Sequence, residues 1–343
     1  MNDCYNLKIT AKEWQFIRSA QYSESLTEIS KNMNTSYVTV YRLYTMLKSK
    51  ASFNYIVDFK KMNLVHITLF FNGYQKIENI HPLTVSIRKV FGVKPYYMVS
   101  AFVPYIYREA FVKSFDNEPV KTIIGYETYK WKPDSPLSLY LESSETIIPV
   151  FNVFYEKYDN LNYPVDNTDY TNKAPDKIDI ALIFRKYKHP FEPLTRSVRH
   201  IRKHDPDFPL ISKQALSYHY KKHIKKLWLY NSIIPLYDSY LVPFRIFYFE
   251  GKEAPILARI LINLPTFYLT SIDTDKAILV GQPPCHIFEN IYRIISMFDV
   301  EMPLGDLVMS NKNMKSYLPP LWHFTENNRW IWKDIKIKIL QPI

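Results

Sequence analysis

The sequence predicts a mixed α+β fold that contains one unit twice: a winged helix-turn-helix domain followed by a ferredoxin-like βαββαβ domain. A helix-turn-helix pattern and an apolar strand occupy residues 26–73, and both recur in residues 194–251. The expected N-caps of the two second helices, Ser36 and Ser212, are 176 residues apart (212 − 36), and the glycines that end the two strands are 178 apart (251 − 73). Such a near-constant offset is what an internal repeat produces.

At 343 residues the chain is long enough for several domains. The stretch after residue 141 is acidic and rich in Tyr and Asn, which favours a linker between the two copies. The expected domains are a first winged helix-turn-helix (1–62), a first ferredoxin-like domain (63–141), the linker (142–175), a second winged helix-turn-helix (176–238), a second ferredoxin-like domain (239–310) and a C-terminal aromatic tail (311–343). We expect this tail to strap the two halves together.

The first helix-turn-helix is read from apolar spacing and a cap. Helices are expected over residues 11–20, 26–33 and 37–48, with a wing or linking strand at 54–59. Ser36 can accept hydrogen bonds from the free N–H groups that begin the third helix. The expected core positions of the second and third helices are Leu26, Ile29, Met33, Val40, Leu43 and Leu47.

The rest of the first half alternates strands and helices. Apolar runs predict strands over residues 64–71, 95–102 and 120–129. Leu83, Ile87 and Val90 fall on one helical stripe, so we expect a helix over 81–91, and a second helix over 105–115. The resulting order, strand–helix–strand–strand–helix–strand, is that of a ferredoxin-like split unit.

The second half repeats this order with longer turns. Its expected elements are helices over 176–187, 194–204 and 213–228, a strand over 240–249, a helix over 254–264, strands over 266–272 and 277–281, a helix over 285–298 and a strand over 304–309. Asp273 and Asp275 are expected to form the turn between two of these strands rather than an acid/base pair.

Positive charge is concentrated on the two helix-turn-helix units. The net charge is +11. Residues 185–226 hold twelve Lys/Arg against three acids (12 − 3 = +9), and residues 8–61 hold nine against four (9 − 4 = +5), so the remainder carries about 11 − 14 = −3. Cations placed in this way on both copies indicate a phosphate backbone as the partner.

The outward positions of the two second helices, together with cations of the preceding helix in the second copy, are the candidate DNA-binding residues. Tyr, Thr, Arg, Lys and Gln side chains can reach base edges and phosphates in a major groove. The candidates are Ser36, Tyr37, Thr39, Tyr41, Arg42, Thr45 and Lys48 in the first copy, and Arg199, Arg202, Lys203, Ser212, Lys213, Gln214, Ser217, Tyr218, Lys221, Lys222 and Lys225 in the second.

The segment from Glu28 through Ser36 to Leu47 resembles the helix-turn-helix of the Lrp/AsnC regulators. The ferredoxin-like unit behind it is similar to that family's effector and oligomerisation domain. The resemblance implies binding of double-stranded DNA, with the transcription machinery as a further candidate partner. The chain departs from the family pattern because it carries two copies of the unit, which predicts a monomeric pseudo-dimer or a homodimer. Asn34 stands where the turn often has glycine. Heavy use of Lys, Ile, Tyr and Asn favours an AT-rich, archaeal source.

The sequence lacks the familiar signatures of catalysis. Its six glycines form no phosphate-binding loop and it has no G-x-S-x-G elbow. The histidine pairs His200/His204 and His219/His223 have the i,i+4 spacing of a zinc site, but the second pair lies among lysines, so we expect no metal, no cofactor and no catalytic residue. Two alternatives stay open: an Lrp/AsnC-like enzyme of the sirohaem decarboxylase type, and a structural or partition protein that coats DNA.

Targeting features complete the expectations. No apolar run approaches the roughly 20 residues that span a bilayer. The N-terminus lacks the layout of a signal peptide. Cys4 and Cys285 supply no disulfide framework. We therefore expect a cytoplasmic protein without a membrane partner.

Overall fold

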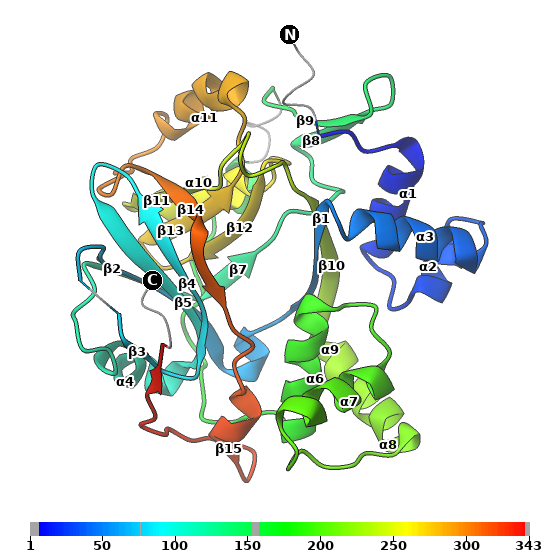
Figure 1. Cartoon of the computed structure of the whole chain (residues 1–343). Helices are drawn as coiled ribbons and strands as arrows, with labels where there is room; N and C mark the ends of the chain where they lie inside the picture. The colour runs from blue at the N-terminus through cyan, green and yellow to red at the C-terminus, as the bar shows by residue number, and fades with distance from the viewer. Residues whose placement is uncertain (1–6, 76, 153–157, 340–343) are drawn as a thin grey trace.

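The computed structural model describes residues 7–75, 77–152 and 158–339. It confirms the mixed α+β class: helices and antiparallel strand pairs alternate along the chain. Figure 1 shows the three N-terminal helices and the α6–α9 group on one side of the molecule, with a large sheet on the other.

The first three helices form where the apolar spacing predicts them. They are α1 (Ala11–Ala20), α2 (Leu26–Asn32) and α3 (Tyr37–Leu47). Thr10 caps α1 through a capping box with Glu13, and Ser25 caps α2. All six core positions predicted from the sequence are buried, together with Phe16 and Ile17 of α1. The helical periodicity therefore identified this core correctly.

The second helical group begins after the linker. It consists of α6 (Lys177–Lys188), α7 (Leu194–His204), α8 (Lys213–His219), a π-helical segment (Tyr220–Ile224) and α9 (Lys225–Leu227). The last three run without a break, so the helix predicted over 213–228 is confirmed, with one wide turn inside it. Asp176 caps α6 through its side chain.

A strand pair joins the two helical groups. β1 (Ala51–Val57) lies antiparallel to β10 (Trp228–Pro235), with Asn54 opposite Ser232. β1 was predicted, a few residues further along the chain. β10 was not, because its residues follow the basic helix directly and no turn residue separates them. In Figure 1 this pair lies between α1–α3 and α6–α9.

The large sheet has nine strands in the order β6-β2-β5-β4-β14-β11-β13-β12-β7. These strands are β2 (Leu64–Asn72), β4 (Thr84–Phe91), β5 (Pro95–Pro104), β6 (Lys121–Gly125), β7 (Glu127–Tyr129), β11 (Arg245–Glu250), β12 (Phe267–Ile272), β13 (Lys276–Gly281) and β14 (Asp306–Ser316). Its two edge strands, β6 and β7, are separated in sequence only by Tyr126, whose N–H donates to the carbonyl of Ile272 at 2.9 Å. The sheet therefore closes on itself.

Alternation along the strands divides apolar residues between the inside and the outside of the closed sheet. Phe70, Met98 and Tyr248 belong to one buried cluster, whereas their neighbours Leu69, Phe71 and Phe249 pack into others. A period of two places successive side chains on opposite faces of a strand. The first cluster fills the inside of the closed sheet and contains residues from both halves of the chain.

The helix predicted over 81–91 is wrong: this segment forms β4, which pairs with β5 on one side and β14 on the other. Leu83, Ile87 and Val90 are buried as expected, but by strand pairing. Thr84, Val85, Ile87 and Val90 are β-branched and suit a pleated surface, and the two available neighbours outweighed the helical spacing. The other helices and strands predicted for the two ferredoxin-like units are present, and their bounds differ from the predicted ones by a few residues.

Helices and the C-terminal tail cover the outside of the sheet. The second half is covered by α10 (Ala254–Leu261) and α11 (Phe288–Ile295), which continues from a 3₁₀ turn, η5 (Cys285–Ile287). The first half has α4 (Arg108–Lys113), preceded by η2 (Tyr105–Tyr107), but the described residues between β2 and β4 form no helix.

The tail and α6 cover the first half where a helix was expected. Leu321, Phe324 and Trp330 are buried in the same cluster as the outer side chains of β2 and β5 and those of α6. The Trp330 indole donates to the carbonyl of Met62 at 3.0 Å, and Trp332 stacks on His81. The short elements of this region are η1 (Lys60–Met62), β3 (Asn79–Ile80), η6 (Leu321–Phe324), β15 (Thr325–Glu326), β16 (Arg329–Trp330) and β17 (Ile337–Lys338), and β17 pairs with β3.

The acidic segment between the halves is bound to the fold along much of its described length. It contains the hairpin strand β9 (Thr146–Pro149), paired with β8 (Ser138–Leu141), and the short helix α5 (Tyr158–Leu161). Asn63 donates to the carbonyl of Lys173 at 2.8 Å and accepts from the N–H of Thr171 at 2.7 Å. Part of the strand that the sequence suggested at 147–155 lies outside the described residues.

Candidate nucleic-acid interface

The first candidate helix, α3, is held by its cap and its buried face. The Ser36 hydroxyl accepts a hydrogen bond from the N–H of Thr39 at 3.2 Å, which satisfies one free donor of the helix start. Val40, Leu43 and Leu47 are buried, so the opposite face is directed outward. Asn34, in the turn before α3, has a φ of 48°, a left-handed conformation that asparagine tolerates better than most residues. It can therefore take the place of the usual glycine.

The outward face of α3 carries aromatic, hydroxyl and guanidinium groups. Tyr37 and Tyr41 are 50% and 53% exposed, and their rings stack with centroids 6.3 Å apart. Arg42 is exposed. The exposed candidates are Ser36, Tyr37, Tyr41, Arg42, Thr45 and Lys48, and Thr39 is half-buried. Of these, Lys48 lies over the ring of Tyr44, at 4.3 Å from its centroid.

The second candidate helix is built in the same way. Ser212 accepts from the N–H of Ala215 at 3.2 Å, while Leu216 and Ile224 are buried. Two of the predicted core positions, Ala215 and Leu227, are only half-buried. The exposed candidates are Ser212, Lys213, Gln214, Tyr218, Lys221, Lys222 and Lys225, and Ser217 is half-buried. The helix therefore presents more cations and fewer base-reading groups than α3.

Three further candidates lie on α7 and one of them differs from expectation. Arg199 and Lys203 are exposed, but Arg202 is half-buried, and its Nε is buried without a hydrogen-bond partner among the described residues. Lys225 forms an ion pair with Glu24, just before α2. Its charge is therefore partly compensated inside the protein, and it links α9 to the first helical group.

Acidic side chains lie between the two helical groups, which the sequence did not reveal. A cleft of about 870 Å³ separates them, and its lining includes the carboxylates Glu24, Glu28 and Glu192 as well as the cations Lys48 and Arg185. Arg185 donates to both oxygens of Glu192, at 2.7 and 2.8 Å. The cleft is therefore mixed in charge, and three of the candidate residues, Tyr37, Tyr41 and Lys48, form part of its wall.

Asp179 brings together two histidines of the second candidate helix. Its carboxylate lies 2.8 Å from Nδ1 of His219 and 2.7 Å from Nδ1 of His223. Among the described residues this is the one group of three or more His, Cys, Asp or Glu side chains with the spacing of a metal site. The sequence contained the histidine pair, but Asp179 is 40 residues before His219, and no local signal connects them.

Two titratable groups near the closure of the sheet have lowered pKa values. His66 is 6% exposed and its Nδ1 lies 3.0 Å from the hydroxyl of Ser271. Burial lowers its pKa to about 4, and the charge of Lys130 acts in the same direction. Burial likewise lowers the pKa of Lys130 to about 7, assisted by Lys188 and Arg88. His66 is buried, and the half-buried Lys130 donates to the side-chain oxygen of Asn54 at 2.6 Å. We assign neither group a contact with nucleic acid.

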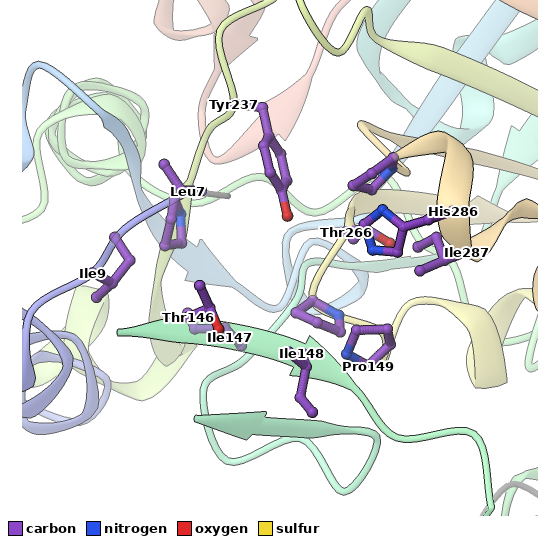
Figure 2. A pocket seen from close by; sticks show the side chains of 13 residues that line it. Leu7, Ile9, Thr146, Ile147, Ile148, Pro149, Tyr237, Thr266, His286 and Ile287 are labelled. Carbon is purple, nitrogen blue, oxygen red and sulfur yellow. The ribbon is translucent and has the colours of Figure 1, made fainter. Parts of the chain in front are cut away.

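A small cavity of about 50 Å³ lies where the β8–β9 hairpin meets residues after β10 and before η5. Figure 2 shows Tyr237, Thr266 and His286 directed towards its centre, with Ile9, Ile147 and other apolar side chains around them. No carboxylate or thiol is among its lining residues. Asp273 does not line this cavity; it accepts hydrogen bonds from the N–H groups of Ile124 and Thr274, as a turn residue does.

Comparison with known proteins adds no relative. No protein-family model, curated protein or solved structure matches the chain. Within the described residues no helix is long and apolar enough to cross a membrane.

Proposed function

We propose that this protein is a DNA-binding transcriptional regulator made of two tandem units, each a winged helix-turn-helix followed by a ferredoxin-like domain. One chain would then act as a pseudo-dimer whose two recognition helices, α3 and the α8–α9 helix, read duplex DNA. The transcription machinery would be its further partner.

The observation that carries the proposal is the pairing of β1 with β10. Asn54 lies opposite Ser232, and these residues are 178 apart (232 − 54), the same offset as the glycines that end β2 and β11. Residues equivalent by the repeat therefore meet each other, as they do across the two-fold axis of a symmetric dimer. The helical groups attached to each strand are then related by this local axis, which suits two half-sites of a duplex.

The strand order supports the ferredoxin-like part of the proposal. Taken in sequence order within each half, the strands lie side by side as fourth, first, third and second: β6-β2-β5-β4 and then β14-β11-β13-β12. Interleaved split βαβ units produce this order. The first half keeps it although its first helix is replaced by the segment containing β3 and by the C-terminal tail.

The chemistry of the two outward faces supports contact with nucleic acid. Arg42 with Tyr37 and Tyr41 supplies groups that can read base edges, whereas Lys213, Lys221 and Lys222 supply charge for phosphates. The two faces differ, so the preferred site is expected to be asymmetric. The cleft between the units is lined by Tyr37, Tyr41 and Lys48 of α3 as well as by the carboxylates, so phosphates are expected at its α3 wall and away from the carboxylates.

Selection of bound sequences from a random duplex pool tests this function, followed by a salt titration of binding to the selected site. We expect an asymmetric site protected over two neighbouring major-groove segments, about 34 Å apart, and an affinity that falls steeply with salt. Failure to bind any duplex at low salt would remove the proposal. Uniform protection without a preferred sequence would replace it by the DNA-coating alternative.

A further inference from the structure

The histidine pair on the second candidate helix faces a buried carboxylate from another helix. Asp179 is in the first turn of α6, and its side chain is 3% exposed. Each of its two oxygens lies within hydrogen-bonding distance of one imidazole Nδ1, that of His219 or of His223. One donor atom from each residue lies within 4.8 Å of the others. Three donors are thus gathered from two helices around one small volume.

The partners of the carboxylate both come from the second candidate helix. Its hydrogen bonds and ion pairs among the described residues are those to the two imidazoles. A carboxylate that is taken out of water needs its charge compensated. A divalent cation bound by the same three side chains would supply that compensation.

The backbone at this point has an unusual form. His219 ends α8, and His223 lies in the π-helical segment that follows it. Single π turns are uncommon and are frequently found at functional sites. Histidines at i,i+4 on a helix provide the spacing of many zinc sites.

The cluster is open on one side. The His223 side chain is 41% exposed and that of His219 is 16% exposed, so an ion and its remaining water ligands have access from solvent. Lys221 and Lys222, which counted against a metal in the sequence, are both exposed and are therefore well solvated. The present oxygen–nitrogen distances are those of hydrogen bonds, and the ligands would separate by roughly 0.5 Å around a tetrahedral ion.

We propose that Asp179, His219 and His223 form a three-ligand site for a divalent transition metal ion, with zinc as the ion that best fits two imidazoles and one carboxylate. The bound ion would fasten the α8–π segment to α6. It would leave a fourth position to water, the arrangement of an open zinc site. This site does not rest on the DNA-binding proposal, because it is defined by side chains directed towards α6.

The test uses the full chain, freed of metal with a chelator and then titrated with Co²⁺, whose visible absorption reports its ligands, followed by Zn²⁺ in competition. We expect one Co²⁺ per chain, displaced by Zn²⁺. His223→Ala and Asp179→Asn should each lower the affinity at least about 100-fold. His223 is partly exposed, so its variant should fold even if the substitution at buried Asp179 disturbs folding; circular dichroism checks both.

The chain offers a matched control. His200 and His204 have the same i,i+4 spacing on α7, with ring centroids 5.0 Å apart, but no carboxylate completes the group among the described residues. His200→Ala plus His204→Ala should leave the stoichiometry and affinity unchanged. Absence of specific binding by the unaltered chain, undiminished binding by folded His223→Ala, or loss of binding in the α7 double variant would each overturn the proposal. None of these readouts involves DNA.

Discussion

Ser271 of β12 lies against Gly125 of β6, at the point where the large sheet closes. A Cβ added to Gly125 would lie 1.8 Å from the Ser271 hydroxyl oxygen and 2.9 Å from the carbonyl oxygen of His66. The same hydroxyl lies 3.0 Å from Nδ1 of His66 on β2. Closure of the sheet thus depends on Gly125, which has no side chain and lies between His66 of β2 and Ser271 of β12, 205 residues apart in sequence.

Replacement of Gly125 by alanine should destabilise the protein. Because neighbouring strands must move to admit the methyl group, we expect a loss of roughly 1–3 kcal/mol in the free energy of unfolding, measured by urea denaturation. Gly125→Ala combined with Ser271→Gly should cost less than the sum of the separate changes, since the second removes the nearest atoms. Strict additivity of the two would contradict this contact.

The buried His66 predicts a defined loss of stability in acid. Its pKa is about 4 in the folded protein against 6.5 when unperturbed. Between these two pH values the histidine is therefore protonated in the unfolded chain and neutral in the folded protein. Its contribution is fully present above pH 6.5 and is lost as the pH falls from 6.5 to about 4. Relative to His66→Asn, the unaltered protein should lose up to about 1.4 kcal/mol per pH unit in this window.

Denaturant unfolding at several pH values between 4 and 7 measures this difference. Burial also lowers the pKa of His189 to about 4, but that residue is present in both proteins, so its contribution cancels. Parallel pH dependences of the two proteins would show that His66 is protonated equally in both states.

The lysines of the second helix should contribute to binding without reading sequence. Lys221→Ala plus Lys222→Ala is expected to lower affinity for all duplexes and to reduce the slope of log affinity against log salt by about one to two. Lys94→Ala plus Lys252→Ala removes the same charge from other exposed positions and should leave the slope unchanged. Equal slopes for both double variants would exclude the second helix from the interface.

Arg42 should act at one half-site only. Arg42→Ala is expected to weaken binding by about 1–3 kcal/mol at the selected site and to remove protection from the half contacted by α3. Arg42→Lys retains the charge but not the two donor groups of the guanidinium, so it should keep the salt slope of the unaltered protein without its sequence preference. An unaltered footprint in Arg42→Ala would remove this residue from the interface.

Arg259 should be required to hold the linker against the second half. It is 2% exposed, donates to both oxygens of Glu127 at 2.9 and 2.7 Å, and donates to the carbonyls of Leu161 and Tyr163. Arg259→Met leaves the carboxylate without its partner and should cost roughly 3–5 kcal/mol.

Limited proteolysis and denaturant unfolding check this prediction together. Cleavage near Leu161 should become faster in Arg259→Met. The exposed pair of Arg293 and Glu289 is the matched control, and Arg293→Met should cost less than about 1 kcal/mol because both partners are hydrated. A similar cost for both substitutions would argue against the anchoring role.

The local elements of the helical groups could be predicted from the sequence. The bounds of α1 and α7 were predicted to the residue, and the caps Ser36 and Ser212 occupy the predicted positions. Apolar periodicity and capping chemistry act between residues at most a few positions apart, so a single stretch of sequence contains all the information they need. The 178-residue offset between the two copies could also be found from the sequence, because it needs only a comparison of two such stretches.

Tertiary structure alone decided the rest. Thr84–Phe91 became β4 because β5 and β14 were both available to pair with it. Asp179 reached His219 and His223, and Glu24 reached Lys225, through packing between segments far apart in the sequence. Such contacts depend on which surfaces are buried together, and burial is a property of the whole chain that no local pattern contains.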